Sequence, residues 1–291
     1  MSTPDIRRYA LLGDSGFIGR RLKERLIESG AEVHGYSSRD VDLLRPEALS
    51  TLDEVVGPET CLILLAGLTP DKGMTVKAMA ANVAMASNVA QYLEQRPVGQ
   101  CVYFSSDAVY EFQEDPVSEE TQVDLPNLYA VAKYTGERAL QAVAAAQGFP
   151  LLILRPTGVF GPGDTHNSYG PNRFVKTVVS EGKVSIFGAG EETRDHVYLD
   201  DAVDLTLALA GAGAAGVFNV VSGESRTFGS IVEDLKRVAS KPFEVVQLPR
   251  SGGAITHRQY DASRIRKALP DFRFTPFQQA LKATYEAAAT Q

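Results

Sequence analysis

Apolar runs alternate with helical patterns along the first half of the chain. The run RYALLGD at 8–14 predicts a strand. FIGRRLKERLIESG at 17–30 predicts a helix with Ile18, Leu22 and Leu26 on one stripe and a stop at Gly30. The continuous apolar run TCLILLAG at 60–67 is typical of a strand buried on both faces.

The same alternation continues to about residue 158. Further strands are expected at 31–38, 101–106 and 150–161, and further helices at 45–57 (carrying Leu49, Leu52 and Val56), at about 74–96 and around Tyr129. Strands that alternate with helices predict an α/β fold, a Rossmann-type doubly wound parallel sheet with helices on both faces.

The regular order ends after about residue 158. GPGDTHNSYGPNR at 161–173 reads as a loop, and shorter elements follow, with a strand at 184–188 and a helix that opens at Asp200 and Asp201. The last helix is expected to open at TPFQ, with Thr275 as cap, Pro276 in the first turn and Gln278 completing a capping box. This part reads as a smaller, irregular C-terminal substrate lobe, and the predicted domains are 1–158 plus about 196–224 for the dinucleotide, and 159–195 with 225–291 for the substrate.

Composition narrows the class of protein. The 291 residues carry a net charge of −7, which argues against a nucleic-acid or anionic-membrane surface. No apolar run is long enough to cross a bilayer and no signal-peptide pattern precedes the first strand, so a cytoplasmic enzyme or binding protein is expected.

Cysteine and histidine do not predict a metal site. Cys61 and Cys101 fall in predicted buried strands, where they act as small core residues, and neither a disulfide framework nor a zinc site is expected. The histidines lack metal-binding spacing and are read as surface or structural residues, with His166 and His196 as candidates for substrate contact.

The turn GDSGFIG joins the first strand to the first helix. Its glycines, Gly13, Gly16 and Gly19, would let backbone amides approach a pyrophosphate at the positive end of the helix. Tight strand-to-helix turns also use glycine for steric reasons alone. Asp14 is unusual here, because a carboxylate repels a pyrophosphate unless it points away.

The end of the second strand bears on the choice of cofactor. NAD calls for a carboxylate that binds the ribose 2′-hydroxyl, yet Tyr36 is followed by Ser37, Ser38 and Arg39, with no carboxylate before Asp40. Hydroxyls and a guanidinium suit a 2′-phosphate, so NADP is favoured over NAD. A polar loop with a solvated arginine would leave the choice open.

Tyr129 and Lys133 stand four residues apart on a predicted helix, which puts both side chains on one face. With the glycine turn and FSSDAVY at 104–110, this pair makes the chain resemble the extended short-chain dehydrogenase/reductase family, the nucleotide-sugar epimerase, dehydratase and 4-ketoreductase group. LAG at 65–67, YAVAK, LRPTGVFGPG and RDHVYLDDA with Arg194 match in order and spacing. The resemblance covers nearly the whole chain and implies reversible oxidation at a sugar carbon.

The resemblance places the catalytic trio on Ser106, Tyr129 and Lys133. A free phenol has a pKa near 10, and an ammonium one turn away is expected to lower it, so that Tyr129 can act as acid and base. Asp107 is a further candidate for protonating or positioning substrate, or for capping the next turn. Family dehydratases carry an acid at the following position, where this chain has Ala108, and this departure argues against dehydration.

The family's binding residues carry over position by position. Arg194 and Arg258 match the arginines that grip a diphosphate, although each could be merely exposed, and Gly158 replaces a frequent Asn. Ser106 and Asp107 would also touch substrate. The implied cofactor-binding residues are Gly13, Ser15, Gly16, Phe17, Ile18, Gly19, Ser38, Arg39, Asp42, Leu43, Leu65, Ala66, Gly67, Tyr129, Lys133 and Pro156.

Three functions are compatible with these motifs. The first is an NADP- or NAD-dependent oxidoreductase that reduces a 4-keto nucleotide-diphosphate sugar or epimerises such a sugar. The second is an extended-family reductase of a non-sugar carbonyl, and the third is a dinucleotide-binding regulatory module without turnover. A homodimer packed through the helices at 74–96 and 129–147 is expected by resemblance.

Overall fold

The computed structural model describes residues 5–111, 115–166, 168–250, 252 and 255–290. The chain divides into two compact units. Unit 1 comprises Met1–Glu111, Gln122–Pro156 and Val203–Asn219, and unit 2 comprises Phe112–Thr121, Thr157–Ala202 and Val220–Gln291. The predicted cofactor domain overlaps unit 1, but residues 112–121 fall in unit 2 and the returning segment is 203–219.

Unit 1 is built on a six-stranded sheet in the order β10-β5-β4-β3-β1-β2. β1 pairs in parallel with β2 and β3, and β4 pairs in parallel with β3 and β5, as expected for a doubly wound sheet. Its elements are β1 Arg8–Leu12, α1 Phe17–Glu28, β2 Glu32–Tyr36, the 3-10 helix η1 Pro46–Leu52, β3 Thr60–Leu64, η2 Pro70–Lys72, α2 Val76–Gln95, β4 Gln100–Phe104, η3 Asp107–Val109, α3 Leu128–Gln147, β5 Leu151–Pro156, α5 Leu199–Gly211 and β10 Gly216–Val220.

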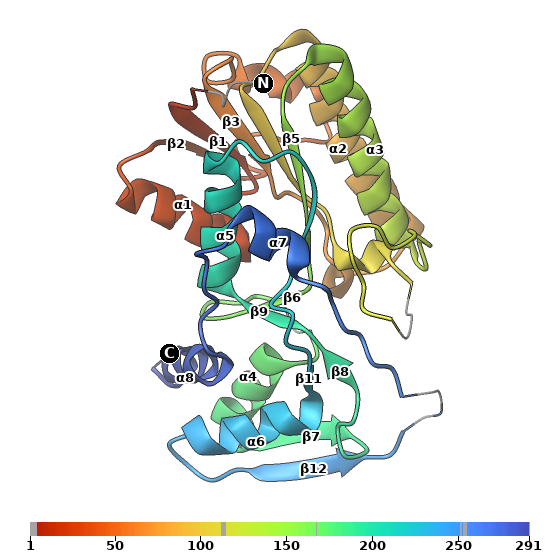
Figure 1. Ribbon diagram of the computed structural model, residues 1–291, viewed down its shortest axis with the longest axis vertical. Coiled ribbons are helices and arrows are strands. Elements are labelled where there is room, and N and C mark those ends of the chain that lie inside the picture. Colours follow the sequence, from red (N-terminus) through yellow and green to blue (C-terminus); the bar gives the residue numbers. More distant parts are fainter. Residues whose placement is uncertain (1–4, 112–114, 167, 251, 253–254, 291) are drawn as a thin grey trace. The chain divides into compact units, whose positions relative to one another are not determined.

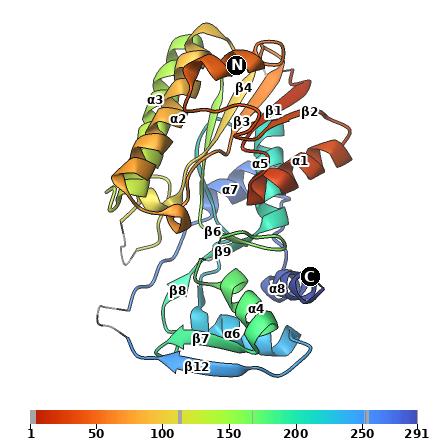
Figure 2. The ribbon, with the colours of Figure 1, turned by 180° about the vertical axis from the view of Figure 1, so that it is seen from behind.

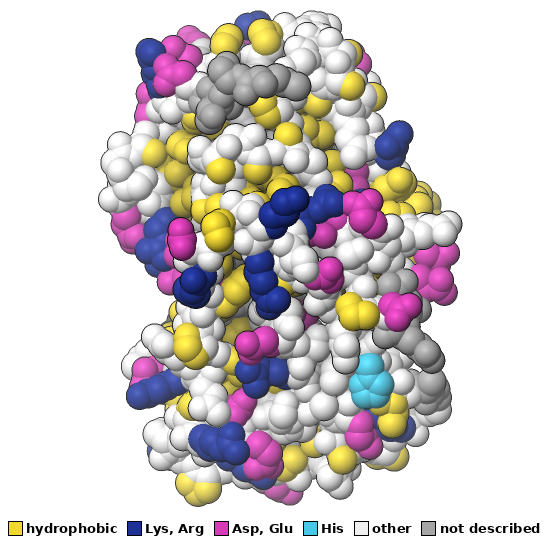
Figure 3. All heavy atoms as spheres, in the orientation of Figure 1, with side chains coloured by type: hydrophobic (Ala, Val, Ile, Leu, Met, Phe, Trp, Pro, Cys, Tyr) yellow, Lys and Arg dark blue, Asp and Glu magenta, His cyan; other side chains and the backbone are white. Residues whose placement is uncertain are grey.

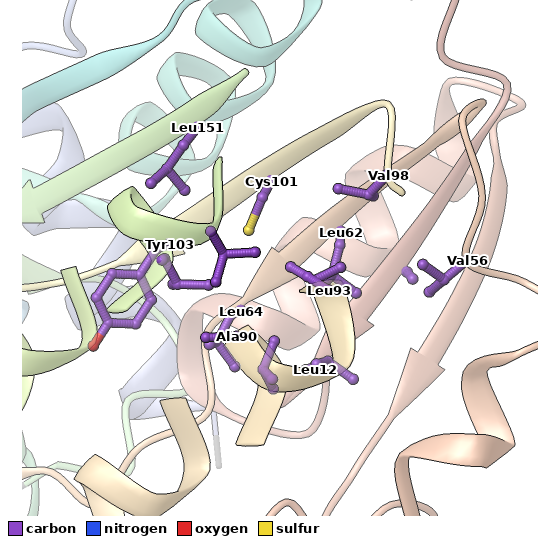
Figure 4. Close-up of a cluster of buried hydrophobic side chains, with 14 of the residues drawn as sticks. Leu12, Val56, Leu62, Leu64, Ala90, Leu93, Val98, Cys101, Tyr103 and Leu151 are labelled. Atoms are coloured by element: carbon purple, nitrogen blue, oxygen red, sulfur yellow. The ribbon is translucent and has the colours of Figure 1, made fainter. Parts of the chain in front are cut away.

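Helices cover both faces of this sheet, α2 and α3 on one side and α1 and α5 on the other (Figures 1 and 2). Apolar residues of β1, β3, β4 and β5 meet those of α2 and α3 in one buried cluster (Figure 4). Cys101 lies inside it among leucines, and both cysteines are free, as small core residues would be. α3 can pack closely against α2 because Gly136 of α3 has no side chain. A Cβ at this position would lie 3.0 Å from the Cβ of Ala86 in α2.

The helix expected at 45–57 is only partly formed. A 3-10 helix runs from Pro46 to Leu52 and a turn follows, because Val55 and Val56 both bond back to the Leu52 carbonyl. Leu49, Leu52 and Val56 are nevertheless buried as expected, whereas the type of the helix and its C-terminal end were predicted wrongly.

The described residues of unit 2 form three two-stranded sheets, β6–β9, β7–β12 and β8–β11, and a separate apolar core made largely by α4, α6, α8 and β7. Its elements are β6 Gly158–Phe160, α4 Pro171–Glu181, β7 Lys183–Phe187, β8 Thr193–Arg194, β9 His196–Tyr198, β11 Arg226–Thr227, α6 Phe228–Val238, β12 Glu244–Leu248, α7 Ser263–Ala268 and α8 Phe277–Ala289.

The capping box predicted for the last helix does not form. The Thr275 hydroxyl donates to Asp201 at 2.7 Å instead of capping α8, and the Gln278 amide donates to Asp234 at 2.7 Å. Pro276 occupies the N-cap position. Two carboxylates distant in sequence therefore outcompete the local cap.

Acidic and basic side chains are interspersed on the face drawn in Figure 3. Within the described ranges, no helix combines the length and the hydropathy that a membrane crossing requires.

Candidate functional site

The turn between β1 and α1 is shaped by its glycines. Gly13 has φ +100°, and a Cβ there would lie 2.8 Å from the backbone nitrogen of Ala66. A Cβ on Gly19 would lie 2.2 Å from the Gly13 carbonyl oxygen. Gly16 is the N-cap of α1, and the first turn of that helix carries no acidic residue. A helix end with no acidic residue in its first turn can receive a pyrophosphate, so the turn fits a dinucleotide.

Asp14 points away from the helix end. Its carboxylate pairs with Lys23 of α1 at 2.8 Å, and a Cβ on Gly35 of β2 would lie 2.3 Å from the same carboxylate oxygen. The pairing with Lys23 removes the repulsion that this residue would otherwise exert on an anionic ligand. The other turn residues differ in exposure, with Ser15 exposed, Ile18 partly buried and Phe17 buried.

The end of β3 lies directly beside this turn. The amides of Leu65 and Ala66 both donate to the Leu12 carbonyl, at 3.0 and 2.9 Å. The chain passes from β1 to β2 on one side and then to β3 on the other, so the point where the strand order reverses lies between β1 and β3. Ligands of open α/β sheets bind at such a point. The structure thus brings Leu65, Ala66 and Gly67 together with the glycine turn.

The end of β2 is organised by Asp40. Its carboxylate accepts the Ser37 hydroxyl at 2.6 Å and the Ser37 amide at 2.8 Å, and the bond from the hydroxyl is the main reason that the pKa of Asp40 is lowered. Ser38 and Arg39 are exposed at the tip of this turn. The serine and arginine expected to meet a 2′-phosphate are therefore accessible, whereas Asp40 is occupied by Ser37.

Asp42 and Leu43 continue the same segment. The Leu43 carbonyl accepts the side-chain amide of Asn88 at 2.8 Å, and Leu43 is buried. Asp42 accepts the Leu44 amide at 3.1 Å. Leu43 therefore ties the loop to α2, and Asp42 braces the loop itself.

Ser106 and Tyr129 meet in unit 1. Ser106 follows β4, and its hydroxyl accepts the Ala108 amide at 3.1 Å, so that serine rather than Asp107 caps the short turn η3. Tyr129 lies in the first turn of α3, which Asn127 caps through the Ala130 amide. The neighbouring Ser106 hydroxyl acts to lower the pKa of the Tyr129 phenol, against the larger effect of burial.

Lys133 is buried one turn further along α3. Its ammonium donates to the Phe104 carbonyl at 2.8 Å and lies 5.9 Å from the centroid of the Tyr129 ring. A Cβ on Gly67 would lie 3.1 Å from Lys133 Nζ. The predicted trio and the predicted β3 loop therefore converge on one place.

The protonation of this group differs from expectation. Burial, with smaller electrostatic contributions from Asp107 and Asp71, raises the pKa of Tyr129 to about 12. Burial lowers the pKa of Lys133 to about 8. The net pKa of the phenol is thus raised where the sequence predicted a lowering, and burial is the largest cause.

Asp107 lies beside the trio. Its carboxylate is 3.4 Å from the Ser106 hydroxyl, and its charge helps to raise the pKa of Tyr129. Pro156, at the end of β5, is partly buried.

Arg194 and Arg258 come together in unit 2. Thr193 bridges to His257, and the Arg258 amide donates to the Thr193 carbonyl at 3.1 Å. The Arg194 guanidinium donates to Thr256 at 2.8 and 2.9 Å, and Arg258 is buried. The two arginines thus lie on adjacent segments, although the chain runs through β9, α5, β10, β11, α6 and β12 between them.

His166 and His196 differ in their surroundings. His166 bonds Asp164 at 2.8 Å, and burial lowers the pKa of His196 to about 3, so this ring is neutral. Among the residues that the structure describes, no group of three or more metal-binding side chains occurs.

Sequence reasoning missed a buried ion pair beside the trio. Glu137 of α3 and Arg155 of β5 form two hydrogen bonds at 2.6 and 2.9 Å. The available signal was the spacing of Glu137, four residues after Lys133, which continues the face that Tyr129 begins.

A sequence model described as the NAD dependent epimerase/dehydratase family matches residues 9–221 of the chain. The chain belongs to this family. The match spans the glycine turn, the Ser106–Tyr129–Lys133 group and Arg194, which are the family motifs identified in the sequence.

Known relatives of this epimerase/dehydratase chain differ in activity. It is 28% identical over 280 residues to a GDP-6-deoxy-D-mannose reductase of Pseudomonas aeruginosa, covering 89% of each chain. It is 23% identical over 290 residues to a UDP-glucuronate 4-epimerase of Thermodesulfobacterium geofontis, covering 90% of each.

Solved structures share the fold. The structure of RMD from Pseudomonas aeruginosa complexed with NADPH superposes with a TM-score of 0.84 at 24% identity, over 98% of this chain and 99% of that one. A Thermus thermophilus UDP-glucose 4-epimerase complexed with NAD gives 0.83 at 21%, over 97% and 98%.

Proposed function

We propose that this family member is an NADP-dependent 4-ketoreductase of a nucleotide-diphosphate sugar. The observation that carries the proposal is the position of the Tyr129 phenol, whose pKa burial raises and whose ring lies 5.9 Å from the buried Lys133 ammonium. A phenol that keeps its proton is suited to donate it, as reduction of a ketone requires. The 28% identical relative is a reductase, which supports the same direction of reaction.

The residues of the chain divide the work around a bound ketone. When bound, the nicotinamide cofactor would supply the hydride. Ser106 would orient the carbonyl oxygen, and Tyr129 would transfer its proton to that oxygen. One C–H and one O–H bond form as the carbonyl double bond is lost, and Tyr129 regains its proton from solvent. Lys133 would hold the ribose next to the nicotinamide and balance the phenolate left behind.

Dehydration is disfavoured by the residue after Asp107. In this chain that residue is Ala108, whose amide donates to Ser106 and whose side chain cannot take a proton. Without a second acid beside it, Asp107 would assist only in positioning the substrate. Arg194 and Arg258 are proposed to contact the diphosphate, where paired guanidiniums make strong charge-assisted bonds.

The preference for NADP would depend on Ser38 and Arg39. Replacing Arg39 with Ala should weaken NADPH binding by about tenfold, about 1.4 kcal/mol, since one charge-assisted bond to the 2′-phosphate is lost. NADH binding should stay within about twofold. Equal losses for both cofactors in fluorescence titrations would contradict a role in recognising the 2′-phosphate.

Epimerisation is the second candidate, because relatives of similar identity are 4-epimerases. The two reactions can be separated with NADPH and a panel of 4-keto nucleotide sugars, following the absorbance of the reduced nicotinamide. Reduction predicts stoichiometric loss of absorbance, abolished in Tyr129→Phe. Epimerisation predicts conversion of a 4-hydroxy sugar with catalytic cofactor and no net change.

Two other results would overturn both reactions. Turnover of simple ketones without any stabilisation by nucleotide sugars in thermal unfolding would indicate a non-sugar reductase. Dinucleotide binding with no turnover of any substrate would indicate a regulatory module.

The assembly is also a proposal. Ala142, Ala145 and Ala146 are exposed on α3, and small residues allow another helix to approach closely. We propose a homodimer through α2 and α3, in the cytoplasm. Light scattering gives the molar mass of the unmodified protein and of Ala145→Glu in solution. A dimeric mass that falls to the monomeric mass in the variant is expected, and a monomeric mass for both proteins would refute the homodimer.

A further inference from the structure

Glu137 is a fully buried carboxylate at the centre of a polar network in unit 1. It accepts Arg155 Nε at 2.9 Å, Arg155 Nη2 at 2.6 Å and the Ser105 hydroxyl at 2.5 Å. Relative exposure is 0% for Glu137 and 4% for Arg155. Three bonds to one desolvated carboxylate fix its position.

The network reaches across the sheet. Arg155 Nη1 donates to the Tyr110 hydroxyl at 2.7 Å, and that hydroxyl donates to Asn219 at 2.9 Å. α3, β5 and β10 are therefore tied together with the segment that follows β4. Ser105 precedes Ser106 in the chain, so the carboxylate also anchors the backbone that carries Ser106.

Glu137 is placed to act on Lys133. The two residues are four apart on α3, on the face that also bears Tyr129. The groups that the structure places around Lys133 include the Tyr129 ring of α3, the Phe104 carbonyl and the Tyr103 ring from β4, and Gly67 from the loop after β3. Asn82 Oδ1 of α2 lies near the Gly67 position. Burial lowers the pKa of Lys133, whereas the charge of Glu137 acts to raise it.

We propose that Glu137, held by Arg155, is a positioning residue that keeps Lys133 cationic at neutral pH and fixes the segment bearing Ser106. Glu137 acts through Lys133 and Ser105 and touches no reacting atom. Its functional meaning rests on the proposed role of Lys133 as the partner of Tyr129. A structural brace alone would change stability but would not change the titration of Lys133.

The test is the titration of Lys133 by NMR of lysine-labelled, cofactor-free protein, with Lys133→Met to assign the signal. The parent should titrate near 8. In Glu137→Gln the midpoint should fall by at least about one pH unit, because the attraction is lost and the cation of Arg155 remains.

A second variant guards against misfolding. Glu137→Gln with Arg155→Met removes both charges, so no buried guanidinium is left unpaired. Its Lys133 midpoint should lie between those of the parent and of Glu137→Gln. Asp53→Asn breaks another ion pair, with Arg96 at 2.6 Å, and should leave the midpoint unchanged.

Two results overturn the proposal. One is a folded double variant whose Lys133 titrates as in the parent, and the other is a parent Lys133 already neutral at pH 7. Failure of the proposed function would give a different result. The Lys133 titration midpoint would still shift in Glu137→Gln, but NADPH binding and ketone reduction at pH 7 would be the same in this variant as in the unmodified protein.

Discussion

Two buried carboxylates in the molecule are handled in different ways. In unit 1, Glu137 is matched by the guanidinium of Arg155. In unit 2, Asp195 accepts the Ser222 amide at 3.0 Å, the Ser222 hydroxyl at 3.0 Å and the Gly223 amide at 2.8 Å, all neutral donors. Burial raises the pKa of Asp195.

The two carboxylates differ in their partners: Glu137 is paired with a cation, whereas Asp195 is held by neutral donors. The carboxylate of Glu137 is paired with a buried cation and lies one helical turn from Lys133 on α3. The neutral donors around Asp195 fasten the loop after β10 to the segment between Arg194 and His196. The first arrangement suits chemistry, and the second suits fixing a backbone.

The largest effect on activity should come from replacing Tyr129, the proposed proton donor beside Lys133. Tyr129→Phe should reduce kcat for the identified substrate by about 10²–10⁴-fold, since the proton donor is lost. Tyr134→Phe, on the same helix, is the matched control and should retain activity. Similar losses in both variants would mean that α3, not the phenol, is the sensitive feature.

Breaking the charge balance in unit 1 should cost the most stability. Arg155→Met leaves Glu137 buried without a cation and should lower the free energy of unfolding by about 3–5 kcal/mol. Adding Glu137→Gln should recover part of that loss in denaturant unfolding. A double variant less stable than the single one would show that the pair is not the source of the penalty.

The corresponding change in unit 2 should be milder. Asp195→Asn keeps the size but turns one acceptor into a donor facing Ser222 and Gly223, at a cost of about 1–3 kcal/mol. The measurement is again denaturant unfolding. A loss as large as that in Arg155→Met would remove the distinction between the two carboxylates.

The smallest effect concerns pH. Because the folded pKa of Asp195 is raised, the folded state binds this proton more tightly than the unfolded chain does. Its contribution to stability is complete below the unfolded pKa, about 3.9, and is lost as pH rises through the folded value. The destabilisation by Asp195→Asn should therefore shrink between acid and neutral pH, and a difference that grows over this range would contradict the assignment.

Local patterns predicted much of this molecule. The family assignment and the α/β class are confirmed, as is the stop of α1 near Gly30, which has φ +78°. The pairing of Thr275 with Asp201 was not predictable, because the partner is 74 residues away and no spacing rule connects them. The pairing of Lys23 with Asp14 spans only nine residues, but it too matches no helical or turn spacing.

The sequence alone determined the alternation of strands and helices, the glycine turn and the Tyr129–Lys133 face, because periodicity and turn geometry act over a few residues. Only the tertiary structure decided the protonation of Tyr129 and Lys133, the burial of Glu137 and its pairing with Arg155. Desolvation and charge pairing depend on which distant segments meet, and these two effects set the sign of each pKa shift.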